Sequence, residues 1–359
     1  MEPRVQVEPS DNPCMPEGAK SLSFKELLTS VRPTANLTKL LSLGFGIILV
    51  SWLVSQLEIS AAFEIIRNVP ISLLIVGFVC YAAAFFLRAV RFKVLLPQDQ
   101  ATHHLFPIVL VHYTALNIIP ARLGELSYVY LLKKINAVPT GYSLSSLILA
   151  RVFDQIALSL LFLSSTLFVE LPTSWLQTLS LGVGIFLGVT CGVLILLLTY
   201  QETCLQWLKR VLARFSWSNT TIVQRILHEL EHMVQAFQHI HLAPKVIKVL
   251  GLSVGIWVSI FSVNYFLLRA FHVPLSYVEV VLTSTFIILL GLLPLHIVSG
   301  IGVHETTWVF ITLALGVSRN VAITAAFGTH ILSILYLGFF GMYGVWRLRH
   351  PLNASKPKE

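Results

Sequence analysis

Long apolar stretches alternate with short polar ones along most of the chain. Each long stretch is close to the length of about 20 residues with which an apolar helix crosses a bilayer. They lie at about residues 40–57, 71–87, 143–168, 176–200, 246–268 and 321–346. The pattern predicts an all-α, polytopic (multi-pass) membrane protein. Between the first two spans it predicts a short polar loop around Glu58, Glu64 and Arg67.

Two polar breaks interrupt this pattern, at residues 117–125 and 294–305. The apolar pieces beside them are too short for a comfortable crossing and lie at 105–119, 126–132, 280–293 and 307–315. Proline and glycine end helices, and irregular backbone persists at membrane depth only inside the protein or beside a water-filled cavity. The breaks therefore predict two re-entrant helical hairpins. Their backbone hinges are expected at Pro120, Gly124, Pro294, Gly300 and Gly302.

The positions of lysine and arginine indicate on which side each segment ends, because basic residues favour the cytoplasmic side. If both hairpins crossed the membrane, Lys133, Lys134 and the basic insert 201–244 would lie outside. If both hairpins re-enter, the basic N-terminal tail, the insert and the C-terminal basic residues face the cytoplasm, as do Arg88, Arg91 and Lys93 at the end of the second span and Lys133 and Lys134. The loop 169–175, which has no lysine or arginine, then lies outside. The re-entrant arrangement predicts six crossings, three per half, with both termini cytoplasmic. Because three is odd, the halves become inverted repeats, as in transporters whose site lies between such repeats.

This arrangement divides the chain into consecutive parts. They are a cytoplasmic N-terminal tail (1–36), a first membrane repeat (37–175), a second membrane repeat (176–350) that contains the insert 201–244, and a cytoplasmic tail (351–359). Apolar residues of the insert recur every three or four positions, which predicts amphipathic helices at the cytoplasmic surface. His228 and His232 have a spacing compatible with metal binding, but no carboxylate or cysteine pattern completes a zinc motif, so a solvated face is favoured.

Charged and titratable residues within or beside the apolar segments are the candidate site. A charge at membrane depth is costly and faces the protein interior or a water-filled cavity. The candidates for substrate binding are Arg122, Glu125, Arg151, Asp154, His304 and Glu305. Arg151 and Asp154 lie three positions apart on one helix and can pair. If the hairpin tips meet near the midplane, Glu125 and Glu305 lie close together. His330, in the last span, is interpreted as a hydrogen-bonded core residue.

Composition supports a membrane protein and excludes some functions. Of the 359 residues, 55% are hydrophobic and 12% are charged, whereas soluble domains carry about 25% charged residues. The net charge of +8 comes from basic residues beside the spans, where they set orientation and meet anionic lipid. Nucleic acid is therefore not an expected partner. The four cysteines have no metal-ligand or redox spacing, and neither a metal ion nor a cofactor is expected.

Many of these residues also carry a resemblance to a known family. In chain order they are Pro120, Arg122, Gly124, Glu125, Arg151, Asp154, Pro294, Gly300, Gly302 and Glu305. Over about residues 40–347, the chain resembles the lysylphosphatidylglycerol synthase transmembrane (flippase-like) family, which includes the membrane half of the multiple peptide resistance factor. Tyr128 and His304 stand where the family pattern has arginine. Both departures remove a fixed positive charge, so the preferred head group stays open.

The resemblance implies movement of a phospholipid or lipid-linked molecule between leaflets of the cell (inner or plasma) membrane, and the expected partner is an anionic or lipid-linked membrane lipid. Arg122 and Arg151 would bind its phosphate. Glu125, Asp154 and Glu305 would pair with these arginines, with an amine or with a proton. Because aminoacyl transfer belongs to a separate soluble domain in the related protein, and only short polar tails are present here, no enzyme activity is expected. No nucleotide-binding loop is present, so transport would be passive, ion-coupled or driven by a partner.

Two other hypotheses stay open. An intramembrane transferase acting on a lipid would use Glu125 or Glu305 as its base, with His304 or His330 as the partner of that base. A non-transporting membrane assembly protein would not depend on the hairpin charges at all. A homo-oligomer or a partner enzyme is compatible with each hypothesis.

Overall fold

The chain is helical throughout the part that the structure describes. The computed structural model describes residues 51–96, 101–119, 124–136, 138–169, 171–212, 227, 231, 243–290 and 301–350. Within these ranges there are helices, turns and loops and no strand. The all-α prediction is therefore confirmed for these residues. The first expected span, 40–57, lies largely outside them, and only its end is described.

Five of the described helices are long and apolar enough to cross a membrane. They are α4 (Ile71–Leu95), α7 (Thr140–Thr166), α8 (Ser174–Thr199), α11 (Ala243–Ala270) and α14 (Arg319–Arg349). They correspond to the second to sixth spans predicted from hydropathy. The protein is therefore a multi-pass membrane protein.

Four shorter helices flank the two polar breaks. They are α5 (Thr102–Ile118), α6 (Glu125–Asn136), α12 (Tyr277–Leu290) and α13 (Val303–Ala314). The segments between them, 120–123 and 291–300, lie outside the described residues. Pro120, Arg122, Pro294 and Gly300 belong to these segments, so their predicted roles stay predictions.

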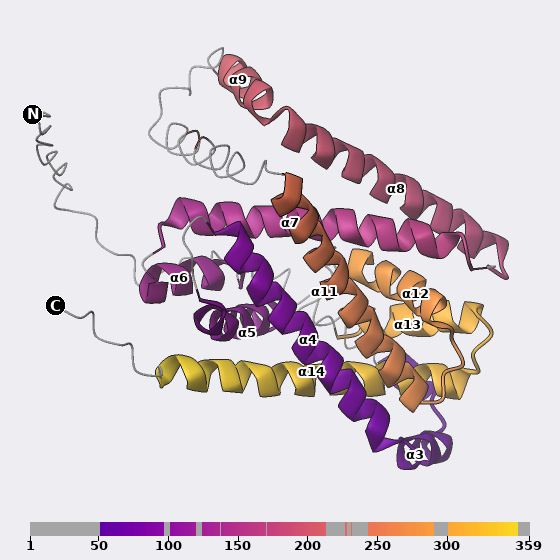
Figure 1. The fold of residues 1–359 in the computed structure, drawn as a ribbon. Helices are drawn as coiled ribbons and strands as arrows, with labels where there is room; N and C mark the ends of the chain where they lie inside the picture. The colour runs from indigo at the N-terminus through magenta and orange to yellow at the C-terminus, as the bar shows by residue number, and fades with distance from the viewer. Residues whose placement is uncertain are drawn as a thin grey trace, which may run out of the picture. The chain divides into compact units, whose positions relative to one another are not determined.

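The helix packing centres on α4 and α11, which lie side by side along much of their length (Figure 1). Helix α7 contacts both of them. Helix α5 packs against α14, and α12 packs against α7, so the helix before each break contacts the last span of the other half. The buried cluster next to the first break combines aliphatic residues with aromatic ones, among them Phe85, Phe92, Tyr128 and Phe340. This packing brings polar residues of α4, α6, α7 and α11 together.

Two elements differ from the predictions. The expected loop after the first span contains helix α3 (Ile59–Arg67), because Ile59, Phe63 and Ile66 recur at helical spacing and form an exposed apolar side that an amphipathic helix can present to an interface. Helix α4 continues to Leu95, eight residues beyond the predicted end. It continues because Arg91, which was expected beyond the cytoplasmic end of this span, is buried against the carboxylate of Asp154.

The insert 201–244 is described only in part. Helix α9 (Gln201–Leu212) follows α8 directly and contacts it. The longer apolar stripe of the insert, with His228 and His232, lies outside the described residues.

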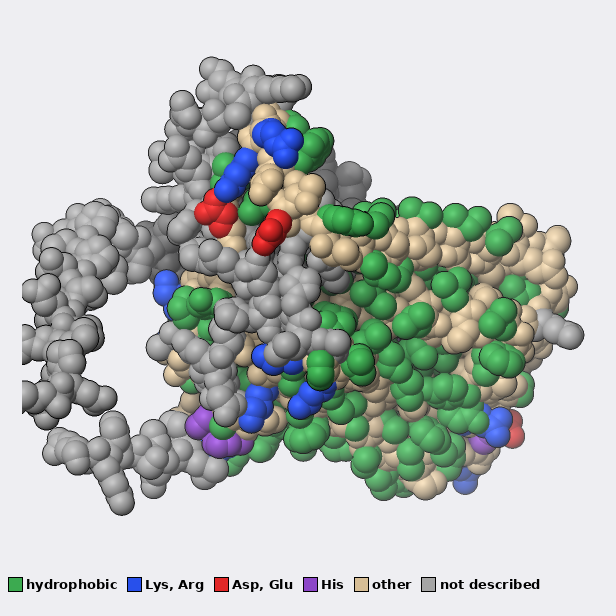
Figure 2. All heavy atoms as spheres, turned by 45° about the horizontal axis from the view of Figure 1, so that its top comes forward, with side chains coloured by type: hydrophobic (Ala, Val, Ile, Leu, Met, Phe, Trp, Pro, Cys, Tyr) green, Lys and Arg blue, Asp and Glu red, His purple; other side chains and the backbone are tan. Residues whose placement is uncertain are grey.

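Apolar side chains cover much of the surface. Figure 2 shows a broad hydrophobic area, with charged side chains mainly toward its ends. Helix α8, for example, exposes Leu181, Ile185 and Val189. Exposed apolar patches of this extent mark contact with a membrane or another protein, and on a multi-pass protein they fit contact with lipid.

Candidate functional site

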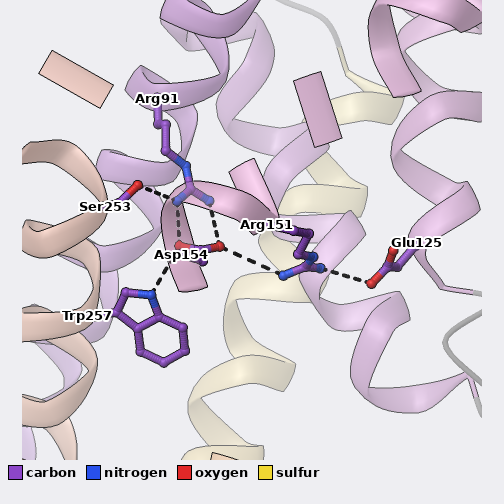
Figure 3. A network of polar contacts seen from close by, with 6 residues as sticks. All are labelled: Arg91, Glu125, Arg151, Asp154, Ser253 and Trp257. Atoms are coloured by element: carbon purple, nitrogen blue, oxygen red, sulfur yellow. Dashed lines mark hydrogen bonds and ion pairs between the residues drawn. The ribbon is translucent and has the colours of Figure 1, made fainter. Parts of the chain in front are cut away.

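A buried polar network connects α4, α7 and α11 (Figure 3). Arg91 of α4 has a side chain that is 0% exposed. Its Nη1 and Nη2 donate to the two carboxylate oxygens of Asp154 on α7, with 3.1 Å between Nη2 and Oδ2. Nη1 also donates to Ser253 Oγ at 2.9 Å, and Trp257 Nε1 donates to Asp154 Oδ1 at 3.2 Å, both from α11. Bidentate pairing of this kind is the strongest arrangement for arginine and carboxylate.

The network continues outward through Arg151 to Glu125. Arg151 Nη1 lies 4.0 Å from Asp154 Oδ2, and Arg151 Nη2 lies 3.3 Å from Glu125 Oε1 on α6. The side chains of Arg151 and Glu125 are 35% and 28% exposed. The predicted pair of Arg151 and Asp154 is therefore present at the limit of an ion pair, while the closer partner of Asp154 is Arg91. We call the series Arg91–Asp154–Arg151–Glu125 the charge ladder.

A third arginine lies next to the charge ladder. Arg88, 9% exposed, holds its guanidinium carbon 3.9 Å from the ring centre of Tyr113 on α5. Its Nε has no hydrogen-bond partner among the described residues. Arg88, Arg91 and Arg151 thus face only two carboxylates, Asp154 and Glu125, in the described network. The excess of positive charge favours an anionic group.

Close packing at the first break places Glu125 at the start of α6. A Cβ on Gly124 would lie 2.5 Å from backbone atoms of Ala115 and Leu116, so only glycine permits this approach of α6 to α5. Ser127 Oγ donates to the carbonyl of Gly124 at 2.6 Å, and His112 Nδ1 lies 3.3 Å from the same hydroxyl. These contacts fix the first turn of α6, which carries Glu125 toward Arg151.

A second polar cluster lies where α13 meets α14. Gly302 precedes α13 with a positive φ of 90°, a conformation that favours glycine. Glu305 Oε2 accepts the backbone N–H of Gly302, and Oε1 lies 2.7 Å from His330 Nδ1. The ring of His304 lies 4.1 Å from the ring of His330. Glu305 is 3% exposed and His330 is 6% exposed, in agreement with His330 as a hydrogen-bonded core residue.

The two clusters occupy corresponding places in the two halves. Glu125 and Glu305 each lie at the start of the helix after a break. Arg151 follows Glu125 by 26 residues on α7, and His330 follows Glu305 by 25 on α14. Among the described residues, no hydrogen bond or ion pair joins the two clusters, so the predicted proximity of Glu125 and Glu305 stays a prediction.

The donor groups of the second cluster are those that bind metal ions. One potential ligand atom from each of His304, Glu305 and His330 lies within 4.8 Å of the others. The charge ladder also contains carboxylates, but these already pair with arginines. The excess of positive charge around the ladder suits an anion better than a cation.

Sequence reasoning missed Arg91, Ser253 and Trp257. A signal for Arg91 was available. Residues 88–96, which follow the apolar span and include Arg91, contain no proline or glycine, and the first helix-breaking residue is Pro97. A helix that starts in the span therefore continues through Arg91. Ser253 and Trp257 carry no such signal, since a serine or tryptophan in an apolar helix does not reveal its partner.

Comparisons with known proteins cover most of the membrane region. A family model described as the lysylphosphatidylglycerol synthase TM region matches residues 39–341. Neither the curated proteins nor the solved structures contain a match. The resemblance inferred from the motif residues is confirmed.

Proposed function

This chain belongs to the lysylphosphatidylglycerol synthase transmembrane family, and from that premise we propose that it moves a phospholipid or lipid-linked molecule between membrane leaflets. The observation that carries the proposal is the charge ladder, which runs from a fully buried arginine to a partly exposed Arg151–Glu125 pair. Charged residues inside membrane proteins commonly mark a substrate path. A polar head group needs such a path, whereas its acyl chains can remain in the lipid.

In the proposed mechanism, the head-group phosphate competes with Glu125 for Arg151. A guanidinium presents two parallel N–H groups that fit a phosphate. Glu125 Oε1 pairs with Arg151 at 3.3 Å, and in this mechanism the phosphate displaces it from the guanidinium. The released carboxylate then accepts an amine of the head group or a proton. Arg122, in the preceding break, is proposed as a second phosphate ligand.

An apolar groove between α5 and α14 supports lipid as the substrate. Its volume is about 720 Å³. Its lining includes Val111, Ile118, Gly338, Met342 and Trp346, with Arg349 and His350 also on it. An acyl chain fits the apolar part, while the basic residues suit a phosphate at the membrane surface.

We also propose the inverted-repeat topology, with two re-entrant hairpins, six crossings and cytoplasmic termini in the plasma membrane. The packing of α5 against α14 and of α12 against α7 supports it, because a two-fold operation that exchanges the halves relates these contacts. The half-site of each repeat then contains a glutamate and a basic partner. Motion of one repeat against the other would expose the path to either leaflet.

The test is lipid movement in liposomes that contain the purified protein. A fluorescent lipid is quenched from outside, with zwitterionic, anionic and amine-bearing head groups compared. We expect the wild-type protein to expose inner-leaflet label and Glu125→Gln to lose most of this activity, because the amide keeps the shape but removes the charge. Glu64→Gln, on an exposed part of α3, is the matched control. Absence of movement by the wild type with every head group would overturn the proposal.

A second candidate is an intramembrane transferase, favoured by the 2.7 Å contact between Glu305 and His330. A carboxylate and an imidazole at this distance can act together in proton transfer. Chemistry on a lipid continues in detergent, whereas movement between leaflets requires a bilayer. Conversion of a lipid by the detergent-solubilised protein, detected by mass spectrometry, would therefore favour the transferase over the transporter.

A further inference from the structure

We propose that His304, Glu305 and His330 form a binding site for a divalent transition-metal ion such as Zn²⁺ or Co²⁺. Two imidazoles and one carboxylate are a common ligand set for zinc, and a site with three protein ligands keeps a fourth position open. The inference goes beyond lipid movement and does not depend on it.

The geometry needs little rearrangement to accept an ion. One ligand atom from each residue already lies within 4.8 Å of the other two. Zinc binds these ligand types at about 2.0–2.2 Å, so ligand atoms around one ion lie about 3–3.5 Å apart. Glu305 Oε1 and His330 Nδ1 are 2.7 Å apart and must separate slightly. The ring of His304, 4.1 Å from that of His330, must turn toward them.

The cluster contains a polar atom without a partner. His304 Nδ1 is buried and has no hydrogen-bond partner among the described residues. Leaving a buried polar atom unsatisfied is unfavourable, and such atoms are rare in native proteins. Coordination of an ion by this nitrogen would remove the deficiency.

Charge also favours a cation here. The carboxylate of Glu305 is 3% exposed, and a buried carboxylate needs a compensating positive group. In the first half, Glu125 meets the fixed charge of Arg151. In the second half, the corresponding partner is the imidazole of His330, and no lysine or arginine pairs with Glu305 among the described residues. The glutamate of the second cluster can therefore pair with an exchangeable cation, whereas the glutamate of the first cluster pairs with the permanent charge of Arg151.

An ion at this site would tie α13 to α14. His304 and Glu305 lie in the first turn of α13, directly after the second break, and His330 lies within α14. Binding and release would therefore change how firmly the helix after the break is held. The competing occupant is a proton shared by Glu305 and His330. A shared proton would not need His304 as a third ligand.

The test uses the full chain, purified without a polyhistidine tag and placed in lipid nanodiscs after treatment with chelator. The histidines His228, His232, His239 and His241 of the insert are replaced by glutamine in every variant, because they could bind metal themselves. Co²⁺ is titrated and its visible absorption recorded, and bound Zn²⁺ is counted by elemental mass spectrometry. We expect one ion per chain, with an absorption intensity typical of four-coordinate cobalt.

His304→Gln and His330→Gln should each weaken binding at least tenfold. His112→Gln, which changes a buried histidine of the first half, should leave binding unchanged. His304→Gln removes no hydrogen bond to a described residue, so it is the variant expected to fold normally. Lack of stoichiometric binding in the parent protein would overturn the proposal and leave a proton as the occupant. Equal binding by the parent protein and His304→Gln would also overturn it.

Discussion

Arg91 is stable in the interior because its guanidinium is satisfied on several sides. Both oxygens of Asp154 and the hydroxyl of Ser253 accept from it, and Trp257 donates to the same carboxylate. A lysine could not replace it, since an ammonium lacks the planar fork that contacts both oxygens. Burying such a pair is close to neutral overall, but separating it leaves a charge in a medium of low dielectric constant.

Removing either member of this pair should therefore destabilise the protein strongly. We expect Asp154→Ala or Arg91→Ala to lower the free energy of unfolding by about 3–5 kcal/mol. The double variant Arg91→Met/Asp154→Leu should be more stable than either single variant, because no charge is left unpaired. The measurement is the folded fraction in detergent after heating, followed by size-exclusion chromatography.

Lys209→Ala serves as the control for this prediction. It removes an exposed partner of Glu231, and exposed ion pairs contribute only about 0–1 kcal/mol. If the two single variants of the buried pair were as stable as Lys209→Ala, Arg91 and Asp154 would be solvated rather than buried.

At the level of residues, sequence reasoning identified the charges within apolar segments but not all their partners. Glu125, Arg151 and Asp154 were recognised because they lie within or beside apolar helices. Arg91 was placed at the cytoplasmic end of the second span because the Lys/Arg rule treats every arginine near a span end alike. Its burial depends on Asp154, 63 residues further along, and no local pattern contains that information.

At the level of elements, the glycines of α14 control its approach to α5. A Cβ on Gly341 would lie 2.5 Å from Thr114 Oγ1, and one on Gly344 would lie 2.9 Å from Leu110. These two glycines allow close packing. Gly338 differs, because its side faces the apolar groove with no atom within 4 Å of an added Cβ. The groove can therefore be filled at one position without a clash.

We expect Gly338→Leu to reduce lipid movement in liposomes severalfold while the protein folds normally. The leucine side chain would occupy the space proposed for an acyl chain. Gly188→Leu is the matched control, since Gly188 on α8 also has no neighbour within 4 Å and does not line the groove. Equal transport by the two variants would remove the groove from the path.

The long helices were predictable from hydropathy because membrane spans are defined mainly by length and apolar content. The predicted ends were less accurate. Helix α4 extends past its apolar part, since a buried ion pair replaces apolar residues there. Helix α3 was expected as a loop, since its nine residues include two charged ones, Glu64 and Arg67, and its apolar residues form a pattern only at helical spacing. Hydropathy averages obscure both cases.

At the level of the whole molecule, the orientation in the membrane rests on the Lys/Arg distribution. Single cysteines can test it in a background without Cys14, Cys80, Cys191 and Cys204. We expect Lys134→Cys and Lys209→Cys to react with a membrane-impermeant maleimide only after cells are opened. Ser174→Cys, in the loop predicted outside, should react on intact cells. All three positions are exposed, so lack of reaction is not a matter of burial.

The opposite result at Lys134 would mean that the first hairpin crosses the membrane. Labelling of Lys209→Cys on intact cells would place the insert outside. Either result would exclude the re-entrant arrangement and, with it, the inverted relation of the halves.

The network around Arg91 also constrains the order in which the protein can be assembled. Its carboxylate partner is synthesised 63 residues later, Ser253 follows Arg91 by 162 residues and Trp257 follows Asp154 by 103. Until α7 has been synthesised, Arg91 has none of these partners, and until α11 has been synthesised, Arg91 lacks Ser253 and Asp154 lacks Trp257. The first half of the chain therefore cannot complete its own interior during synthesis, because the final bonds are supplied by α11 of the second half.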